Sequence, residues 1–286
     1  MNKIDIIIPI YNSKDTLEKT LISIERQNIL DKIEIYLIDD YSTDNYESIL
    51  NRYNNLNIHY HKLDKNVGPG LARQKGIDIS NNKYIFFLDS DDEIFLPDSL
   101  EKLYNEIEKG FDVVVSNTKY EKINEIYNNS GDLHGKLYLR DFIIKNDIKF
   151  NNTRYHEDNA FHNLVIVHGA NTSFIKNITY LYSHNINSLT EIDKEKEFNN
   201  LELLISNTKY IIDIGLKHNC NEFIIRECLY RKIRYLNKRY EDFNNLQKEQ
   251  IQAWLKKYKL NIGEYLNRKD YANIQQEILN NYDLKN

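Results

Sequence analysis

Short apolar runs alternate with longer amphipathic segments near the start of the chain, and this alternation constrains the fold more than any other feature. The first run, 4–10, is rich in isoleucine and holds one proline near its end. Runs of this kind are typical of buried parallel strands. Strands are predicted at 4–10, 33–38, 58–63 and 84–88, and helices between them at 16–27, 42–53 and 71–79. This order predicts an α/β fold whose mostly parallel sheet carries helices on both faces.

The rest of the chain shows a different order of predicted elements and a different spacing of apolar residues. The predicted elements continue with a helix at 99–109, a strand at 112–116, an edge strand or hairpin at 120–127, and helices at 140–146 and 159–167. From about residue 195 proline is absent and apolar residues recur at helical spacing. This pattern predicts a C-terminal α-helical region of roughly three to five helices.

Composition and charge narrow the function classes. The net charge of -5 argues against an overall nucleic-acid-binding role. The two cysteines, Cys220 and Cys228, do not indicate a disulfide framework, which fits a reducing cytoplasm. The longest apolar runs fall short of the roughly 20 residues that a membrane span requires, and no signal peptide precedes the first strand. We therefore expect a cytoplasmic protein without a transmembrane segment, with peripheral attachment to the inner face of the membrane as an alternative.

Three acidic clusters occur in order along the chain: Asp39-Asp40, Asp89 to Asp92, and Glu157-Asp158. The first two directly follow predicted strands, so their carboxylates would lie at the carboxyl edge of the sheet, where open α/β sheets bind ligands. Carboxylates gathered there repel one another unless a cation or a donor-rich ligand compensates them. A divalent metal bound to a diphosphate supplies that compensation, and hard oxygen ligands suit Mg²⁺ or Mn²⁺.

Five motifs occur in order at compatible spacing: Ile8 to Asn12, Leu37 to Asp44, Asn66 to Gly68 with Ala72-Arg73, Leu88 to Asp92, and His156 to Asp158. Together they resemble the GT-A glycosyltransferases of family 2. The likeness covers roughly residues 4–190. It implies a GT-A domain, followed here by the helical region. It also implies an inverting enzyme that uses a nucleotide-diphospho-sugar, most often a UDP-sugar.

The resemblance and the residue types together imply a donor site at the strand ends. Asp40 would accept a hydrogen bond from the uracil N–H, and Tyr11 would pack on the base; a turn or cap role and ordinary packing are the alternatives. Arg73 stands where the family places an arginine on the diphosphate, a role that suits a fixed donor fork, with a surface salt bridge as the alternative. The predicted nucleotide-binding set is Pro9, Tyr11, Asp40, Asn66, Gly68, Arg73, Asp89, Ser90 and Asp91.

Asp89, Ser90 and Asp91 form an Asp-x-Asp signature. Alternate residues at a strand end point the same way, so both carboxylates can reach one divalent ion. We predict that Asp91 binds the metal, with Asp89 and Asp92 as further ligands; ribose binding is the alternative for Asp89. The ion, Mn²⁺ or Mg²⁺, would neutralise charge on the departing diphosphate.

Asp158 is the predicted general base, because in this family the aspartate of a Glu-Asp pair deprotonates the acceptor hydroxyl. A single in-line displacement needs only one base and inverts the anomeric configuration. A role at the start of the following helix is the alternative, both for Asp158 and for Glu157.

Three further segments carry additional signals. His134-Gly135-Lys136 looks family-like, and Gly135 and Lys136 are candidates for the sugar pocket. Residues 182–190 resemble the family segment that closes over the diphosphate, although Ser183 and Asn185 stand where many relatives carry arginine. The basic stretch at 222–243 is either a solvated helix face or a dock for an anionic acceptor.

We therefore predict an inverting, metal-dependent hexosyl- or N-acetylhexosaminyltransferase with a UDP-sugar donor. Residues 1–118 would form the donor-binding half of the GT-A domain, 119–192 the acceptor-binding half, and 193–286 the helical region. The acceptor would be a surface glycan, a lipid-linked intermediate or another polymer; a nucleic acid acceptor is not favoured. The alternative is a non-catalytic sugar-nucleotide-binding or scaffold protein with the same fold.

Overall fold

The computed structural model describes residues 2–128, 131–183 and 194–260, together with part of 262–277. Contacts divide the chain into two units. The first unit comprises Met1–Arg154 and Ala170–Glu191, and the second comprises Tyr155–Gly169 and Ile192–Asn286. The second unit thus joins a short internal segment to the C-terminal region. The functional boundaries expected near residues 118 and 192 stay predictions.

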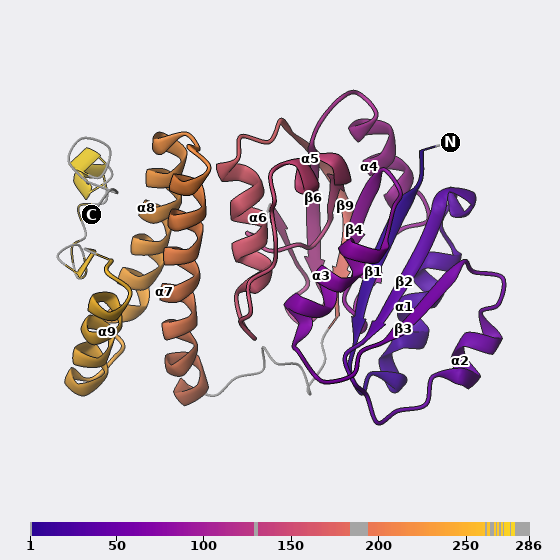
Figure 1. The fold of residues 1–286 in the computed structure, drawn as a ribbon, viewed down its shortest axis with the longest axis horizontal. Coiled ribbons are helices and arrows are strands. Elements are labelled where there is room, and N and C mark those ends of the chain that lie inside the picture. Colours follow the sequence, from indigo (N-terminus) through magenta and orange to yellow (C-terminus); the bar gives the residue numbers. More distant parts are fainter. Residues whose placement is uncertain are drawn as a thin grey trace. The chain divides into compact units, whose positions relative to one another are not determined.

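The first unit opens with four parallel strands, as the apolar runs predict. β1 pairs with β2 and with β4, and β2 pairs with β3. Their order across the sheet is β3-β2-β1-β4, and Figure 1 shows β1, β2 and β3 side by side. The bounds are Ile4–Ile10 for β1, Ile33–Asp39 for β2, Ile58–Lys62 for β3 and Tyr84–Phe87 for β4.

Helices connect these strands, but the second is shorter than the sequence predicts. Their bounds are Lys14–Glu25 for α1, Glu47–Arg52 for α2 and Pro69–Ile79 for α3, with a short 3-10 helix at Leu30–Lys32. The predicted start near Ser42 falls in a turn, where Ser42 N donates to Asp39 Oδ1 at 2.7 Å and Thr43 N donates to Asn12 Oδ1 at 2.9 Å. Short polar side chains satisfy the backbone here, so the helix begins only after them.

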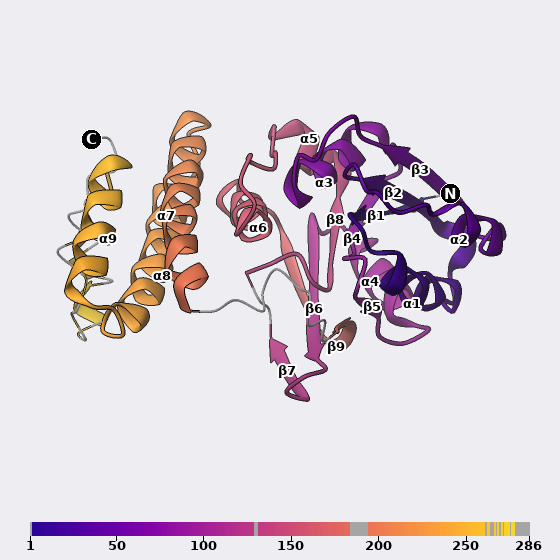
Figure 2. The same ribbon diagram turned by 90° about the horizontal axis from the view of Figure 1, so that it is seen from below.

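The other half of the sheet mixes strand directions. β8 pairs antiparallel with both β4 and β6, β6 pairs parallel with β9, and β5 pairs antiparallel with β9. β6 and β7 form the hairpin expected near 120–127, which Figure 2 shows in profile. The strands are β5 (Glu93–Ile94), β6 (Val113–Tyr120), β7 (Glu125–Asn128), β8 (Lys136–Leu139) and β9 (Thr172–Tyr182), and the helices are α4 (Ser99–Ile107) and α5 (Arg140–Lys145).

The two faces of β1 pack against different helices, because successive strand residues point to opposite faces. The even-numbered isoleucines of β1 lie in one core with α1 and α4. Ile7 points the other way, toward α3, where a Cβ on Gly76 would come within 2.4 Å of Ile7 Cγ2. Helix α3 therefore approaches the sheet closely only because residue 76 is glycine. The mixed α/β sheet with helices on both faces confirms the predicted fold class.

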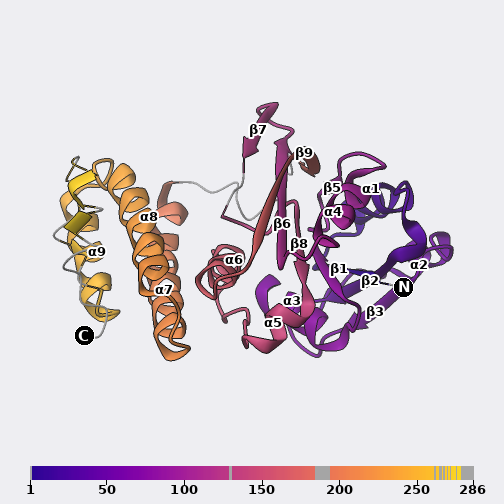
Figure 3. The same ribbon diagram turned by 90° about the horizontal axis from the view of Figure 1, so that it is seen from above.

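The second unit is helical, and its C-terminal part confirms the predicted helical region. Its helices are α6 (Glu157–Val167), α7 (Lys194–Lys217), α8 (Glu222–Tyr240) and α9 (Asn245–Lys257). Helix α7 packs against α6, α8 and α9, and Figure 3 shows α7 beside α8. Asn221 caps α8 by accepting the N–H of Phe223, and Asn244 forms a capping box with Gln247 at α9. These caps stabilise the N-terminal ends of α8 and α9.

Candidate active site

The carboxyl edge of the sheet is organised around Asp40, which is only 3% exposed. Its Oδ1 accepts the N–H of Val67 at 2.6 Å, and its Oδ2 accepts the N–H of Gly68 at 2.8 Å. Asn66 Nδ2 donates to the Asp40 carbonyl at 3.1 Å. Burial raises the pKa of Asp40, while the two backbone donors lower it. Asp40 thus ties the end of β2 to the loop before α3, and each carboxylate oxygen keeps a second lone pair for a ligand N–H.

Asp39, the last residue of β2, is buried beside it. Its Oδ1 accepts the N–H of Ser42 at 2.7 Å, and its Oδ2 accepts the hydroxyl of Tyr60 at 2.5 Å. Lys62 Nζ lies 3.7 Å from the same Oδ2. All these partners belong to the neighbouring turn and strand, so Asp39 holds the loop that follows β2.

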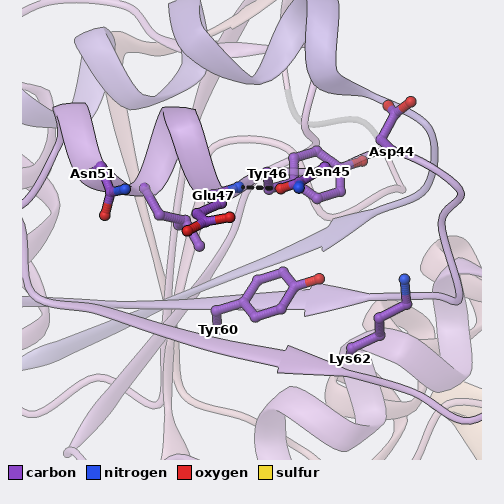
Figure 4. A pocket seen from close by; sticks show the side chains of 8 residues that line it. Asp44, Asn45, Tyr46, Glu47, Asn51, Tyr60 and Lys62 are labelled. Carbon is purple, nitrogen blue, oxygen red and sulfur yellow. Dashed lines mark hydrogen bonds between the residues drawn. The ribbon is translucent and has the colours of Figure 1, made fainter.

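A pocket opens beside this turn, between α2 and β3 (Figure 4). Tyr60 and Lys62 project into it from the same face of β3, as alternate strand residues do. The lining residues are Asp44, Asn45, Tyr46, Glu47, Leu50, Asn51, Tyr60 and Lys62. Most of these residues have no role predicted from the sequence. Because Tyr60 and Lys62 also contact Asp39, the pocket borders the carboxyl edge of the sheet.

The residues predicted for base and loop contacts lie at the same edge. Tyr11 directly follows β1 and is 54% exposed, so one face of its ring is available to a flat ligand. Pro9 is half-buried within β1. Gly68 has a φ of 90°, a conformation that suits glycine, and it directly precedes α3. The structure thus brings Tyr11, Asp40, Asn66 and Gly68 to the ends of neighbouring strands.

Arg73 and Asp89 form an ion pair next to this loop. Arg73 is 6% exposed, and its Nη2 donates to Asp89 Oδ1 at 2.5 Å. Burial would raise the pKa of Asp89, but the Arg73 guanidinium and His134 hold that pKa well below its usual range. The carboxylate is therefore ionised across the physiological range. Ser90 and Asp91 follow it, both half-buried, in the turn after β4.

His134 is a functional candidate for which the sequence predicts no role, although it belongs to a family-like run. Its Nε2 lies 3.7 Å from Asp89 Oδ2, and its Nδ1 lies 3.4 Å from Asp132 Oδ2. The ring stacks on Tyr180 with centroids 4.7 Å apart and planes at 26°. Burial lowers the pKa of His134, but Asp132, Asp89 and Asp92 together raise it well above the usual value. Its only sequence signal was the run His134-Gly135-Lys136.

Asp92 is the most buried acid of the Asp89 to Asp92 cluster, at 1% exposure. Its Oδ2 accepts the hydroxyl of Tyr180 at 2.7 Å, and its Oδ1 accepts the N–H of Ser183 at 2.8 Å. Burial raises the pKa of Asp92 to about 8, and Asp89 and Asp91 add to this effect while His134 opposes it. A cation bound to Asp92 would have to share oxygens that already hold β9 in place.

The donor set fits a divalent cation. Among the residues that the structure describes, Asp89, Asp92 and His134 each offer a ligand atom, and these atoms lie within 4.8 Å of one another. Asp91, the predicted principal ligand, is not part of this group. Two carboxylates with one imidazole suit Mn²⁺ better than Mg²⁺, which prefers oxygen ligands alone. Metal binding by Asp89, Asp91 and Asp92 stays a prediction, to which the geometry adds His134.

We expect His134→Ala to weaken Mn²⁺ binding by about 10- to 100-fold, the usual loss when a ligand or its supporting partner is removed. Calorimetric titration of the apoprotein with Mn²⁺ measures this directly. His59→Ala is the matched control, because His59 is exposed on β3 and pairs with Glu34. Equal affinity in the His134 variant and the wild type would make His134 a purely structural partner of Asp89.

Gly135 and Lys136, the candidates for the sugar pocket, are buried. The Lys136 side chain is 0% exposed, with Nζ 3.6 Å from Asp132 Oδ1. Gly135 has a φ of 63°, and a Cβ there would come within 2.6 Å of Ser116 Oγ. Both residues hold the start of β8 beside His134. Of the predicted closing segment at 182–190, Tyr182 ends β9 and Ser183 follows it, and residues 184–190 lie outside the described residues.

Asp158, the predicted base, lies in the first turn of α6 in the second unit. The side chain is half-buried, and its Oδ1 accepts the N–H of Asn159 at 2.6 Å. His156, just before the helix, has a left-handed φ of 62°. Glu157 is 5% exposed. A carboxylate in a first helical turn is favoured by the helix dipole, so this position also suits the alternative interpretation of Asp158.

The comparison with protein families decides the class. A sequence model described as Glycosyl transferase family 2 matches residues 5–179, more than half of the 286 residues. The chain belongs to this family. The match includes every predicted site residue from Pro9 to Asp158, and it ends before α7. The family membership and the fold confirm the resemblance that the five motifs indicate.

Curated relatives match parts of this chain. YibD, an uncharacterized glycosyltransferase of Escherichia coli K12, is 27% identical over 225 residues, which are 68% of this chain and 65% of YibD. TarP of Staphylococcus aureus N315, a poly(ribitol-phosphate) beta-N-acetylglucosaminyltransferase, is 36% identical over 109 residues, 37% of this chain and 33% of TarP. The chain thus spans less than two thirds of the length of either relative.

Solved structures share the GT-A fold. S. aureus TarS 1-349 in complex with UDP-GlcNAc has a TM-score of 0.75 at 19% identity, covering 96% of this chain and 89% of that one. The mannosyltransferase PcManGT of Pyrobaculum calidifontis, in complex with GDP-Man and Mn²⁺, has a TM-score of 0.59 at 13% identity, covering 99% and 88%. Identities this low carry the fold alone. Among the described residues, no helix has the length and apolar content that crossing a membrane requires.

Proposed function

We propose that this glycosyltransferase transfers a hexosyl or N-acetylhexosaminyl group from a UDP-sugar to an acceptor hydroxyl, with inversion at the anomeric carbon. The observation that carries the proposal is the ion pair between Arg73 and Asp89 at the carboxyl edge, with His134 on the other side of Asp89. A buried guanidinium and a cation-competent acid group side by side match the two needs of a diphosphate, which are fixed donors and a divalent ion. The complex of TarS with UDP-GlcNAc supports the choice of nucleotide.

Different residues of the chain would bind the base, the diphosphate and the metal ion. Asp40 and Tyr11 would hold the base, because Asp40 offers buried acceptor oxygens and Tyr11 an exposed ring. Arg73 would contact the diphosphate and keep Asp89 ionised. Asp91, Asp89 and Asp92, joined by His134, would hold Mn²⁺, which supplies charge neutralisation for the leaving diphosphate.

The chemical step would need one base. Asp158 would accept the proton of the acceptor hydroxyl as the new bond forms between that oxygen and C1. The bond from C1 to the diphosphate oxygen breaks with its electron pair, and UDP leaves. One displacement on the face opposite the leaving group inverts the configuration, which is why a second catalytic carboxylate is unnecessary.

The acceptor class rests on a relative and on the surface charge of α8. We propose a polymeric or lipid-linked acceptor, and the name of TarP, a poly(ribitol-phosphate) transferase, supports a cell-wall polymer. The basic helix α8 is consistent with an anionic chain, since Arg231, Arg234 and Lys238 are exposed on it. A peripheral place at the inner membrane surface would fit such acceptors.

A thermal-shift panel tests the donor. UDP, UDP-GlcNAc, UDP-glucose, GDP-mannose and CMP are each added with and without Mn²⁺. A ligand bound only by the folded state stabilises it by about 2.7 kcal/mol at a hundredfold excess over its dissociation constant. Stabilisation by UDP compounds that requires Mn²⁺ is the expected result. A response to GDP-mannose alone would overturn the choice of nucleotide, and no response to any compound would favour the non-catalytic scaffold.

A further inference from the structure

Helix α6 carries the proposed base, yet it packs in the second unit, with helices that lie beyond the family match. Asn207 of α7 is 2% exposed, and its Nδ2 donates to the carbonyl of Tyr155 at 3.0 Å. This bond holds the chain three residues before Asp158. A helix of the C-terminal region therefore holds the segment that carries the proposed base.

Polar side chains connect α6 to α8 one helical turn further along α6. Lys232 Nζ donates to Asn159 Oδ1, directly next to Asp158 in the chain. Asn163, one helical turn along α6, donates from Nδ2 to Asn159 Oδ1 at 3.1 Å and to the Asn159 carbonyl at 2.7 Å. Cys228, one turn before Lys232 on α8, donates its thiol to Asn163 Oδ1 at 3.4 Å. Residues four apart on one helix thus meet residues four apart on the other.

Desolvating these polar side chains costs free energy that an apolar contact between the two helices would not require. Lys232 is half-buried, and burial lowers the pKa of its ammonium, while Cys228 and Asp158 raise it. The ammonium is therefore within electrostatic reach of the Asp158 carboxylate. A leucine at this position would pack against α6 without the desolvation that a buried charge requires. His156 completes the surroundings of Asp158 and has a lowered pKa, caused first by burial.

We propose that Lys232 is a positioning residue for the base: its ammonium, anchored on Asn159, fixes the first turn of α6 and the direction of the Asp158 carboxylate. The inference rests on the proposed role of Asp158. It gives the helical region a part in catalysis, because α8 supplies the anchor and α7 holds the preceding segment. Lys232 lies outside the residues that the family model matches, so this device belongs to the chain's C-terminal addition.

The test compares Lys232→Met with Lys232→Arg and with Lys256→Met, a control on α9 of the same unit whose lysine is exposed. The activity assay is release of UDP from UDP-GlcNAc with Mn²⁺, with water as the acceptor. We expect Lys232→Met to lower kcat by about 10- to 100-fold, the scale of loss when a catalytic group is displaced by about 1 Å. KM for UDP-GlcNAc should stay unchanged, Lys232→Arg should recover most of kcat, and Lys256→Met should match the wild type.

A second readout needs no activity. The N–H of Ala160 donates to the His156 carbonyl at 2.9 Å, so its hydrogen exchange reports on the first turn of α6. Exchange there should accelerate in Lys232→Met but not in Asp158→Asn, and Asn159→Ala combined with Lys232→Met should lose no more kcat than the worse single variant. Wild-type exchange and kcat in Lys232→Met, with Asp158→Asn inactive, would overturn this inference alone. Full activity in Asp158→Asn would overturn the base assignment and its anchor together.

Discussion

Asp158→Asn is expected to lower the rate of sugar transfer by about 10²- to 10⁴-fold, the usual contribution of a general base. The amide keeps the size of the side chain and can still accept the N–H of Asn159, so the start of α6 should be retained. Loss of a first-turn charge should cost only about 0.3–1 kcal/mol of unfolding free energy. Binding of UDP-GlcNAc with Mn²⁺ should be unchanged. Rates of UDP release and calorimetric donor binding measure the two effects separately.

Asp141→Asn is the matched control for this variant. Asp141 also lies in the first turn of a helix, α5, and it is exposed. A helix-dipole role would give both variants the same small loss of stability and leave turnover intact. If Asp158→Asn turned over at the wild-type rate, Asp158 would be a helix-start residue and the base would have to be sought elsewhere.

Asp91→Ala is expected to abolish the Mn²⁺-dependent part of donor binding. The wild type should gain about 2.7 kcal/mol of stability from UDP at a hundredfold excess over its dissociation constant, and the variant should gain almost none. Asp91 is half-buried in the turn after β4, so its removal should not disturb the core. Denaturant unfolding with and without UDP and Mn²⁺ provides the measurement.

Two further variants serve as controls for this result. Asp31→Ala removes an exposed acid from the same unit and should bind UDP and Mn²⁺ like the wild type. Asp158→Asn should also bind them normally, because its proposed role begins after the donor is bound. Equal loss of donor binding in the Asp91 and Asp158 variants would contradict the separate roles. Normal metal-dependent binding in Asp91→Ala would leave Asp89, Asp92 and His134 as the cation site.

Most of the parallel half of the fold could be predicted from sequence because β1, β2 and β4 are buried on both faces. β1 and β4 are almost wholly buried, and such strands leave continuous apolar runs. β9 could not be predicted in this way, since exposed and half-buried residues alternate through its first half. β8 has four residues and includes a buried lysine, so its pattern resembles a loop.

The same distinction applies to the candidate site, where local motifs indicate some residues and long-range contacts place the others. Asp40, Arg73 and Asp89 follow strands or begin a helix at the carboxyl edge, and local motifs placed them there. His134 reaches Asp89 through antiparallel pairing of β8 with β4, which no local pattern encodes. The grouping of α6 with the C-terminal helices depends likewise on distant contacts, from Asn207 to Tyr155 and from Lys232 to Asn159. Motifs therefore predict the candidate residues, and long-range packing decides which contacts support them.

A crystal structure of the protein with UDP and Mn²⁺, with anomalous scattering measured at the manganese edge, tests the central claim most directly. The predicted result is one anomalous peak within bonding distance of Asp91 or Asp89, with the diphosphate against Arg73 and uracil between Tyr11 and Asp40. A nucleotide bound instead in the pocket between α2 and β3, with manganese away from the Asp89 to Asp92 cluster, would contradict the assignment of the carboxyl edge as the donor site.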